Sequence, residues 1–222
     1  MATAFDSVCG RCRRSGEKLF IKGEKCSSPK CPMVRRAYTP GIHGPAKKGS
    51  SAPSSGGSSG GRGSTSDYGR QLKEKQALRA AYGLRERQLK KYYLEAIKKK
   101  GVTGDFLIQR LESRLDNVVY RLGYGISRQH ARQLVGHGMF ALNGRSVDIP
   151  SLAVKKGDVI TIKETKRKKI VFNDLQERLA NKSLPNWLER TDTYSGKVVD
   201  TPILESHELP ADVQAIVEFY SR

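Results

Sequence analysis

Hydrophobic residues recur at three- and four-residue steps in the middle of the chain, which is the spacing of an amphipathic helix. A thin alanine and leucine stripe across residues 68–100 predicts two helices, divided at Gly83. The clearest run covers residues 105–122 and predicts one continuous helix. Its buried face would consist of Phe106, Leu107, Leu111, Leu115, Val118, Val119 and Leu122.

A shorter helix and a small sheet are expected directly after this run. Ser127 is a good N-cap for the shorter helix, because a serine hydroxyl accepts a hydrogen bond from a free amide of the first turn. Residues 139–149 then favour two strands, joined by Asn143-Gly144 in a tight hairpin turn. Residues 159–162 are typical of a further strand. The pattern therefore predicts a helix–turn–helix followed by an antiparallel sheet.

The remaining segments complete a predicted α+β organisation. Residues 1–45 show little periodicity and are rich in glycine, proline, cysteine and basic residues, which indicates a knuckle and an extended arm. A Gly/Ser-rich stretch follows that cannot build a core. The expected segments are a metal-binding knuckle and basic arm (1–45), a flexible insertion (46–66), a basic helical body (67–104), a helix–turn–helix/β RNA-binding module (105–172), and a tail that packs on the helical body (173–222).

Composition and charge narrow the class of function. The 222 residues include 41 Lys and Arg against 22 Asp and Glu, a formal net charge of +19, and 37% hydrophobic residues. The cationic excess lies in residues 1–172, whereas residues 173–222 are net acidic. Such a charge points to nucleic acid or an anionic membrane surface as partner. No apolar run reaches the roughly 18 residues of a membrane span, and no signal sequence is recognised. We therefore expect nucleic acid, a reducing compartment and no membrane.

All four cysteines lie in the predicted knuckle, at Cys9, Cys12, Cys26 and Cys31. Two cysteines separated by two residues can reach one ion from a tight turn, and the second pair would close a four-thiolate shell. Such a shell is typical of a structural site, and one zinc ion is the first choice. An iron–sulfur cluster also suits four thiolates. Four ordinary reduced cysteines are the alternative without metal.

Cations form stripes along the predicted helices. In residues 105–122 the stripe repeats at steps of four, three and four, and each member precedes a core position. No acid stands at i+4 to balance it, so we expect it to contact phosphate. Arginines near the start of the next helix favour the same ligand. The expected RNA contacts are Arg11, Arg13, Arg14, Arg35, Arg36, His43, Lys73, Arg79, Arg85, Arg110, Arg114, Asn117, Arg121, Ser127, Arg128, Gln129 and Arg132.

Two features admit other interpretations. Tyr82, Tyr92 and Tyr93 of the basic helices are able to stack on RNA bases, but for each one the favoured interpretation is filling of the small core. The Arg-Leu-Asp tripeptide at 114–116 resembles the catalytic tripeptide of RNA pseudouridine synthases. Here it falls within a periodic helix, and too little chain remains for a catalytic domain. We therefore do not expect an enzyme.

Several strings resemble the bacterial small-subunit ribosomal protein S-four family. The longest are RLESRLDNVVYRLG at 110–123 and SRQHARQLVGHG at 127–138, which is followed by Asn-Gly-Arg at 143–145. The resemblance covers nearly the whole chain. The chain departs from the family's pattern mainly at the Gly/Ser stretch, which looks inserted. Further matching strings stand at 9–14, 18–23, 38–44 and 216–222.

The resemblance implies a structural ribosomal protein. Members of the family bind 16S ribosomal RNA directly and early, nucleate assembly of the small (30S) subunit and, with neighbouring proteins, influence translational accuracy. It also implies ribosomal protein S-five and, in some bacteria, the protein's own messenger RNA as partners, in the cytoplasm on the ribosome. The four cysteines resemble the metal-binding branch, which implies one structural zinc ion. The rival hypothesis is a free-standing RNA-modifying enzyme or RNA-binding stress factor that uses the same module.

Overall fold

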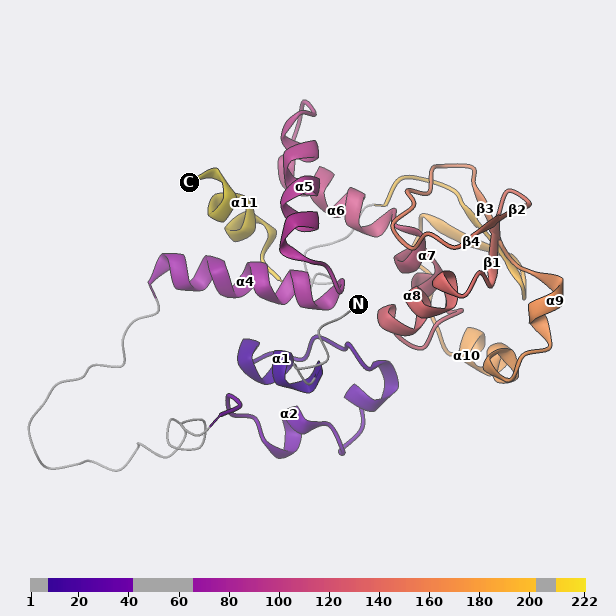
Figure 1. The fold of residues 1–222 in the computed structure, drawn as a ribbon, viewed down its shortest axis with the longest axis horizontal. Helices are drawn as coiled ribbons and strands as arrows, with labels where there is room; N and C mark the ends of the chain where they lie inside the picture. Colours follow the sequence, from indigo (N-terminus) through magenta and orange to yellow (C-terminus); the bar gives the residue numbers. More distant parts are fainter. Residues whose placement is uncertain (1–7, 42–65, 203–210) are drawn as a thin grey trace, which may run out of the picture. The chain divides into compact units, whose positions relative to one another are not determined.

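A computed structural model describes residues 8–41, 66–202 and 211–222 (Figure 1). The chain divides into two compact units. Met1–Glu86 and Leu209–Arg222 form the first unit, and Arg87–Glu208 form the second. The second unit is therefore inserted, in sequence, between the two parts of the first. The predicted flexible insertion lies outside the described residues except for Ser66.

In the first unit, two helices far apart in sequence lie side by side. α4 (Asp67–Ala81) begins after Ser66, whose hydroxyl accepts a hydrogen bond from the Gly69 amide. α11 (Val213–Ser221) packs along α4 (Figure 1). The Lys75 ammonium of α4 is buried 4.2 Å from the centroid of the Phe219 ring. The end of the chain therefore belongs to the first unit.

The predicted knuckle and arm contain more helix than the sequence indicated. α1 (Val8–Ser15) packs on α4 and is followed by the 3-10 helix η1 (Gly23–Cys26) and by α2 (Pro32–Arg35). Leu19 and Ile21, in the segment between α1 and η1, join alanines of α4 in a small core. The expectation of an irregular segment was wrong for residues 8–15, because the apolar contacts of α1 are with a helix distant in sequence.

The second unit begins with helices. α5 (Glu86–Ile97) follows the turn at Gly83, whose φ of +63° suits glycine, so the predicted division there is confirmed. The predicted continuous helix over 105–122 was wrong, because it consists of α6 (Thr103–Glu112) and α7 (Leu115–Arg121). Between them Arg114 has an extended backbone, with ψ of 138°.

This break has a long-range cause. The amides of Leu115 and Asp116 donate to the carbonyls of Leu152 and Pro150, at 2.9 and 3.1 Å. The amide of Val154 donates to the carbonyl of Ser113 at 2.8 Å. The segment after the hairpin thus pairs with the chain at 113–116 and takes over hydrogen bonds that a continuous helix would have made within itself.

The predicted short helix and hairpin are confirmed. α8 (Arg128–Gly136) begins at Ser127, whose hydroxyl accepts a hydrogen bond from the His130 amide at 3.2 Å. Asn143 and Gly144 have φ of +49° and +80°, the backbone that a tight two-residue hairpin requires. They join β1 (Phe140–Leu142) to β2 (Arg145–Val147).

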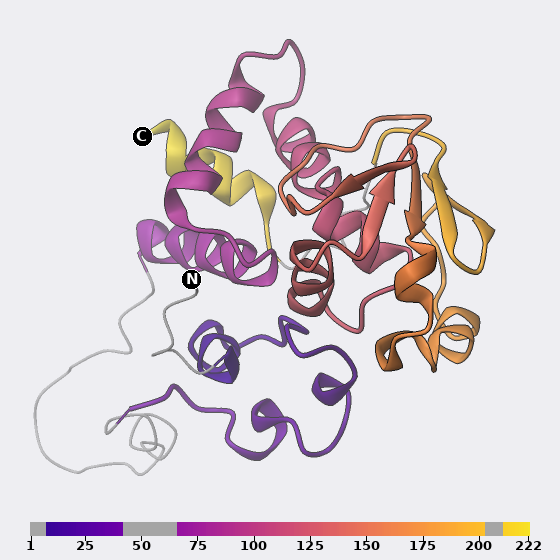
Figure 2. The same cartoon turned by 45° about the vertical axis from the view of Figure 1, so that its right-hand side comes forward.

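The sheet has five antiparallel strands in the order β2-β1-β3-β5-β4, and Figure 2 shows them side by side. β3 (Val159–Ile162) is the strand predicted at 159–162. β4 (Leu188–Asp192) and β5 (Ser195–Val198) come from the segment predicted to be a tail on the helical body. They are instead part of the module's sheet, since β5 pairs with β3. The boundary predicted at residue 172 therefore divides a single sheet.

The core of the second unit lies between helices and sheet. α7 supplies Leu115, Val118, Val119 and Leu122, α8 supplies Leu134 and Val135, and the sheet supplies Phe140, Ile160 and Ile162. Between β3 and β4 the chain forms α9 (Glu164–Arg167), the 3-10 helix η2 (Ile170–Phe172) and α10 (Leu175–Ala180). Within the three described segments, no helix combines the length and apolar character needed to cross a bilayer.

Candidate nucleic-acid interface

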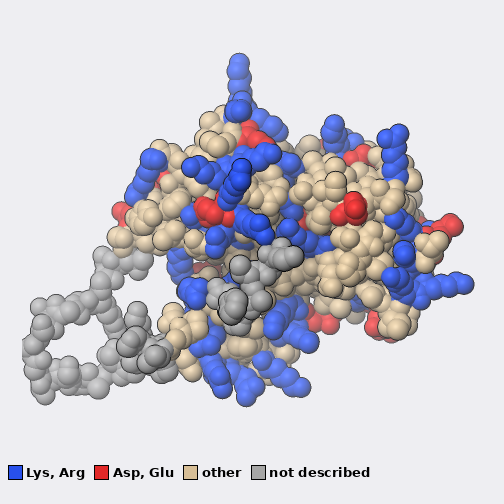
Figure 3. Space-filling model, in the orientation of Figure 1, with Lys and Arg blue, Asp and Glu red and all other residues tan. Residues whose placement is uncertain are grey.

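Cationic side chains stand out on the surface of each unit. On the face seen in Figure 3, Lys and Arg side chains gather over the α1–α2 segment of the first unit and near α9 of the second, with few acidic side chains among them. Such surfaces attract phosphate-rich polymers.

The predicted contacts of the knuckle differ in exposure. Arg14, Arg35 and Arg36 are exposed. Arg11 and Arg13 are half-buried, and the Arg13 Nε donates to the Tyr38 carbonyl at 2.8 Å while its guanidinium lies 4.7 Å from that ring's centroid. Arg13 thus ties the segment after α2 to α1. The predicted contact His43 lies outside the described residues.

The predicted contacts of the helical body line α4 and the turn after it. Lys73 is exposed and lies 3.7 Å from the Glu17 carboxylate. Arg79 forms an ion pair with Glu86 at 3.6 Å, and Arg85 is exposed. Tyr82, Tyr92 and Tyr93 are buried, which confirms that they fill the core and removes them as stacking platforms.

Arg114 is buried, which contradicts its place in an exposed cationic stripe. Its side chain is 1% exposed and donates to both carboxylate oxygens of Asp116, at 3.0 and 2.6 Å, and to the Tyr92 hydroxyl at 2.7 Å. Burial alone would lower the pKa of Arg114, but the bonds and charge of Asp116 outweigh it, and the pKa lies above its ordinary value. Arg114 therefore fixes the break between α6 and α7 and does not reach solvent.

A second buried acid orients the neighbouring arginines. The Glu112 carboxylate is 0% exposed and accepts hydrogen bonds from Asn117 Nδ2 at 2.6 Å and from Arg121 Nε at 2.9 Å. Asn117, itself 2% exposed, accepts a bond from Arg128 Nε at 2.8 Å. Arg128 Nη2 lies 3.7 Å from the same carboxylate. Glu112 and Asn117 thus hold two half-buried arginines in a fixed arrangement.

The stripe is therefore balanced by acids, contrary to the expectation. Arg110 contacts Glu95 at 3.3 Å, and Arg132 lies 3.9 Å from Asp116. The i+4 rule missed these partners because each comes from another helix: Glu95 of α5 faces Arg110 of α6, and Asp116 of α7 faces Arg132 of α8. Of the stripe and its continuation on α8, Arg110, Arg121, Arg128 and Arg132 are half-buried and Gln129 is exposed, while Ser127 serves as the N-cap.

Sequence reasoning missed three basic residues beside this network. The Lys182 ammonium lies 3.8 Å from the Tyr120 ring centroid and donates to the Tyr120 carbonyl. Arg190 donates to the carbonyls of Leu122, Leu179 and Lys182, and Arg178 donates to that of Val171. All three belong to the acidic tail, where cations are scarce. A basic residue in a segment that is otherwise acidic was the one sequence signal that could have pointed to these three residues.

The Lys182 ammonium has an unusual environment. Burial, followed by the charges of Arg121, Arg128, Arg190 and Arg178, lowers the pKa of Lys182 to about 7. Burial likewise lowers the pKa of His130, with a further contribution from Arg178. Basic groups from α7, α8, α10 and β4 are therefore close enough to repel one another.

The four cysteines are gathered but do not form a ligand shell. Cys12, Cys26 and Cys31 are buried, Cys9 is half-buried, and all four are free thiols. Burial raises the pKa of Cys12, and the other three thiols raise it further. Within the described segments, no three side chains among His, Cys, Asp and Glu are grouped as metal ligands. Four thiol donors in one short segment suit a structural metal, and metal binding stays a prediction.

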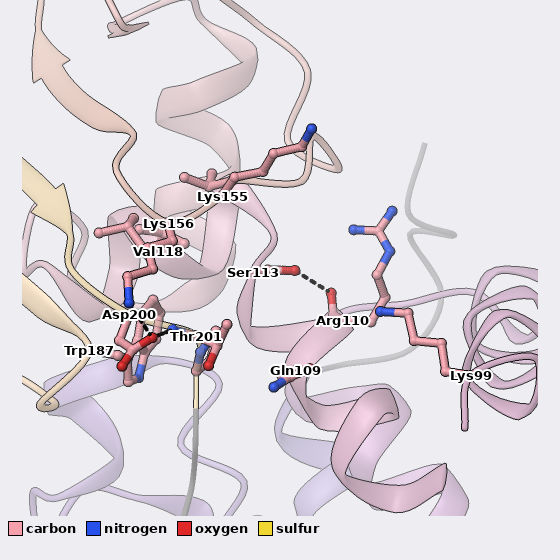
Figure 4. Close-up of a pocket in the computed structure, with 13 residues that line it drawn as sticks. Lys99, Gln109, Arg110, Ser113, Val118, Lys155, Lys156, Trp187, Asp200 and Thr201 are labelled. Carbon is pink, nitrogen blue, oxygen red and sulfur yellow. Dashed lines mark hydrogen bonds and ion pairs between the residues drawn. The ribbon is translucent and has the colours of Figure 1, made fainter. Parts of the chain in front are cut away.

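A pocket of about 250 Å³ lies in the second unit (Figure 4). Lys99 and Arg110 border it on one side, and Lys156 and Trp187 on the other. Lys156 donates to Asp200 at 3.1 Å. The Ser113 hydroxyl donates to the Arg110 carbonyl at 3.3 Å, so it is engaged with its own helix. The lining residues therefore include no hydroxyl or thiol paired with a base, as nucleophilic catalysis would require.

Comparisons with known proteins agree with these features. A family model described as "Ribosomal protein S4/S9 N-terminal domain" matches residues 5–112, and one described as "S4 domain" matches residues 113–160. The two matches meet at the break between α6 and α7. Three relatives carry the name "Small ribosomal subunit protein uS4". The protein of Acetivibrio thermocellus is 47% identical over 223 residues and that of Clostridium botulinum is 47% identical over 223 residues, each with both chains covered completely. The protein of Syntrophomonas wolfei is 45% identical over 218 residues, 98% of each chain. With such identity along its whole length, the chain belongs to the uS4 family of small ribosomal subunit proteins.

Proposed function

We propose that this protein is a structural component of the small ribosomal subunit that binds 16S ribosomal RNA directly. The observation that carries the proposal is the full-length identity to proteins named small ribosomal subunit protein uS4. The cationic surfaces of both units supply the chemistry. Each phosphate neutralised by Lys or Arg releases condensed counterions, and this release drives association without any bond-making. Its location is accordingly the ribosome.

The network around α7 gives the interface a defined geometry. Glu112 and Asp116 are buried acids that hold Arg121, Arg128 and Arg132 in half-buried positions beside the α8 N-terminus. A charged group held in position loses little side-chain entropy when it binds. The same acids argue against the enzyme hypothesis, since Arg114 and Asp116 satisfy each other and are closed to a substrate.

Sedimentation of small subunits tests this function. We expect the protein to remain with 30S particles after a moderate salt wash, and to bind a 16S rRNA transcript more tightly than a 23S transcript of equal length. Equal affinity for both transcripts at near-physiological salt would indicate only non-specific charge attraction. Purified small subunits that lack the polypeptide would contradict the proposal.

We further propose ribosomal protein S-five and the protein's own messenger RNA as additional partners, through which it influences translational accuracy. This proposal rests on the family resemblance alone. Crosslinking within intact 30S particles, followed by mass spectrometry, tests the protein contact. A reporter fused to the leader of this protein's messenger tests repression, which should deepen when the protein is overproduced. Unchanged reporter output would end the messenger proposal.

We also propose that Cys9, Cys12, Cys26 and Cys31 bind one structural zinc ion, with an iron–sulfur cluster as the alternative. The support is the presence of four free thiols, three of them buried, within one small helical segment. Bound zinc would join α1 to η1 and α2 and contribute directly to the stability of that segment. Elemental analysis should find about one zinc per wild-type chain and less in Cys9→Ser. Wild-type protein with neither zinc nor iron would refute the site.

A further inference from the structure

Basic side chains from four elements converge beside the turn that joins α7 to α8. Lys182 and Arg128 share one aromatic ring, since their charged groups lie 3.8 and 4.9 Å from the Tyr120 centroid. A Cβ at Gly123 would lie 2.9 Å from Leu179 Cδ2 and 3.5 Å from Lys182 Cδ. The segment that carries Lys182 is therefore packed tightly against this turn, and the position of the ammonium is fixed.

The cluster contains more donors than the protein satisfies. Arg190 is engaged by three backbone carbonyls, and Arg121 by the Glu112 carboxylate. Arg178 Nη1, by contrast, is buried and has no hydrogen-bond partner among the described residues. A buried donor without an acceptor is costly and calls for an explanation such as an absent ligand.

The charges in the cluster are also unbalanced. Among the described residues, the Glu112 carboxylate is shared between Arg121 and Arg128. Burial raises the pKa of the Tyr124 hydroxyl nearby, which Arg190 opposes and Asp192 reinforces. Against these stand Arg121, Arg128, Arg178, Arg190 and Lys182. An anion of two or more acceptor oxygens would offer an acceptor to Arg178 Nη1 and reduce the repulsion among the cations.

We propose that Lys182, Tyr120 and the surrounding arginines form a binding subsite for one phosphate group of the RNA backbone. This inference rests on the proposed function and deepens it, because it names a contact that lies outside the helix stripe. The phosphodiester would sit against the ammonium and the guanidinium groups, while the Tyr120 ring shields one side from water. Lys182 is the residue that distinguishes this subsite from the general cationic surface.

Occupation of the subsite has a measurable signature. The pKa of Lys182 is about 7 in the free protein, so much of its amine is neutral at pH 7–9. A phosphate beside it favours the charged form, and binding therefore takes up a proton. The charged groups that act on Lys182 are Arg121, Arg128, Arg178 and Arg190, and burial lowers the pKa of the nearby His130 below its ordinary 6.5. RNA affinity should consequently fall as pH rises from 7 to 9.

The experiment measures binding of a 16S rRNA transcript to the full chain at pH 7, 8 and 9 and constant ionic strength. We expect wild-type affinity to fall by up to about tenfold per pH unit, the limit for one linked proton. Lys182→Met should bind several-fold more weakly at pH 7 and lose this dependence. Lys182→Arg should keep its affinity at all three pH values. Lys156→Met is the matched control, because Lys156 is already paired with Asp200, and it should retain the wild-type slope.

The outcomes separate the subsite from the function. If the wild type binds rRNA and Lys182→Met binds equally well with the same pH slope, the subsite is refuted and the function stands. If no variant binds rRNA, the function itself fails. Amine-reactive labelling of Lys182 in wild type, read by mass spectrometry, identifies the anion without any substitution. Protection by the transcript supports the proposal, and protection by inorganic phosphate but not by the transcript overturns it. Circular dichroism verifies that each variant is folded.

Discussion

Replacing Glu112 with glutamine tests whether buried acids hold the interface together. The substitution preserves size but removes the charge that faces Arg121 and Arg128, and it turns one carboxylate oxygen into a donor among donors. Removing one partner of a fully buried ion pair costs about 3–5 kcal/mol. The two arginines retain 17% side-chain exposure, so water solvates them in part. We therefore expect Glu112→Gln to lower the free energy of unfolding by about 2–4 kcal/mol.

Urea denaturation followed by circular dichroism measures this loss, and thermal unfolding should show a fall in midpoint on the order of 10 °C. Glu177→Gln is the matched control, because Glu177 is exposed on α10 and its replacement should change stability by less than about 0.5 kcal/mol. If Glu112→Gln were as stable as this control, the charge of Glu112 would not be needed to compensate Arg121 and Arg128. Buried acids would then not be what holds the arginines of the interface in place.

Three further predictions concern charge, packing and pH. Arg128→Ala should reduce by about one the slope of log affinity for rRNA against log salt. Arg114→Met should leave that slope unchanged and lower the free energy of unfolding by about 3–5 kcal/mol. Equal slopes for both variants would refute the distinction between a contact with phosphate and a structural arginine. Gly196→Ala places a Cβ 2.6 Å from Leu122 Cδ2, so it should destabilise the fold by about 1–3 kcal/mol in urea titrations, and a neutral result would show that β5 can move away from α7. The pKa of Lys182 is about 7 in the fold against 10.5 for the free side chain, so the unfolded chain binds more protons between these values. The stability of wild type relative to Lys182→Met should therefore rise with pH across this window in urea titrations at constant salt, and a constant difference would contradict the lowered pKa.

Features set by neighbouring residues could be predicted from the sequence. The N-cap at Ser127, the hairpin turn at Asn143-Gly144 and the division at Gly83 each depend on a few adjacent positions. Local chemistry is sufficient there, because cap and turn residues have strong conformational preferences.

Features set by distant pairing could not be predicted. The helix break at Arg114 arises from hydrogen bonds with residues 150–154. β5 forms on the edge that β3 offers, and β4 pairs with β5 in turn. Their sequences show little alternation, since Leu188 and Val198 are their main buried residues. The geometry of the candidate site could not be predicted for the same reason. Its cationic stripe was visible, but the helix break at 113–114 brings Asp116 to Arg114 and Glu112 to Arg128, and a continuous helix would not predict these pairs.

The pairing of α11 with α4 has a consequence for biosynthesis. Residues 213–221 are synthesised after the whole of the second unit, so α4 must wait for more than a hundred further residues before its partner arrives. The inserted unit contains its own core and all five strands, and it is able to fold while the chain is still growing. Until α11 has been synthesised, the face of α4 that receives Phe219 stays uncovered. The first unit is thus completed only after the second unit has been made.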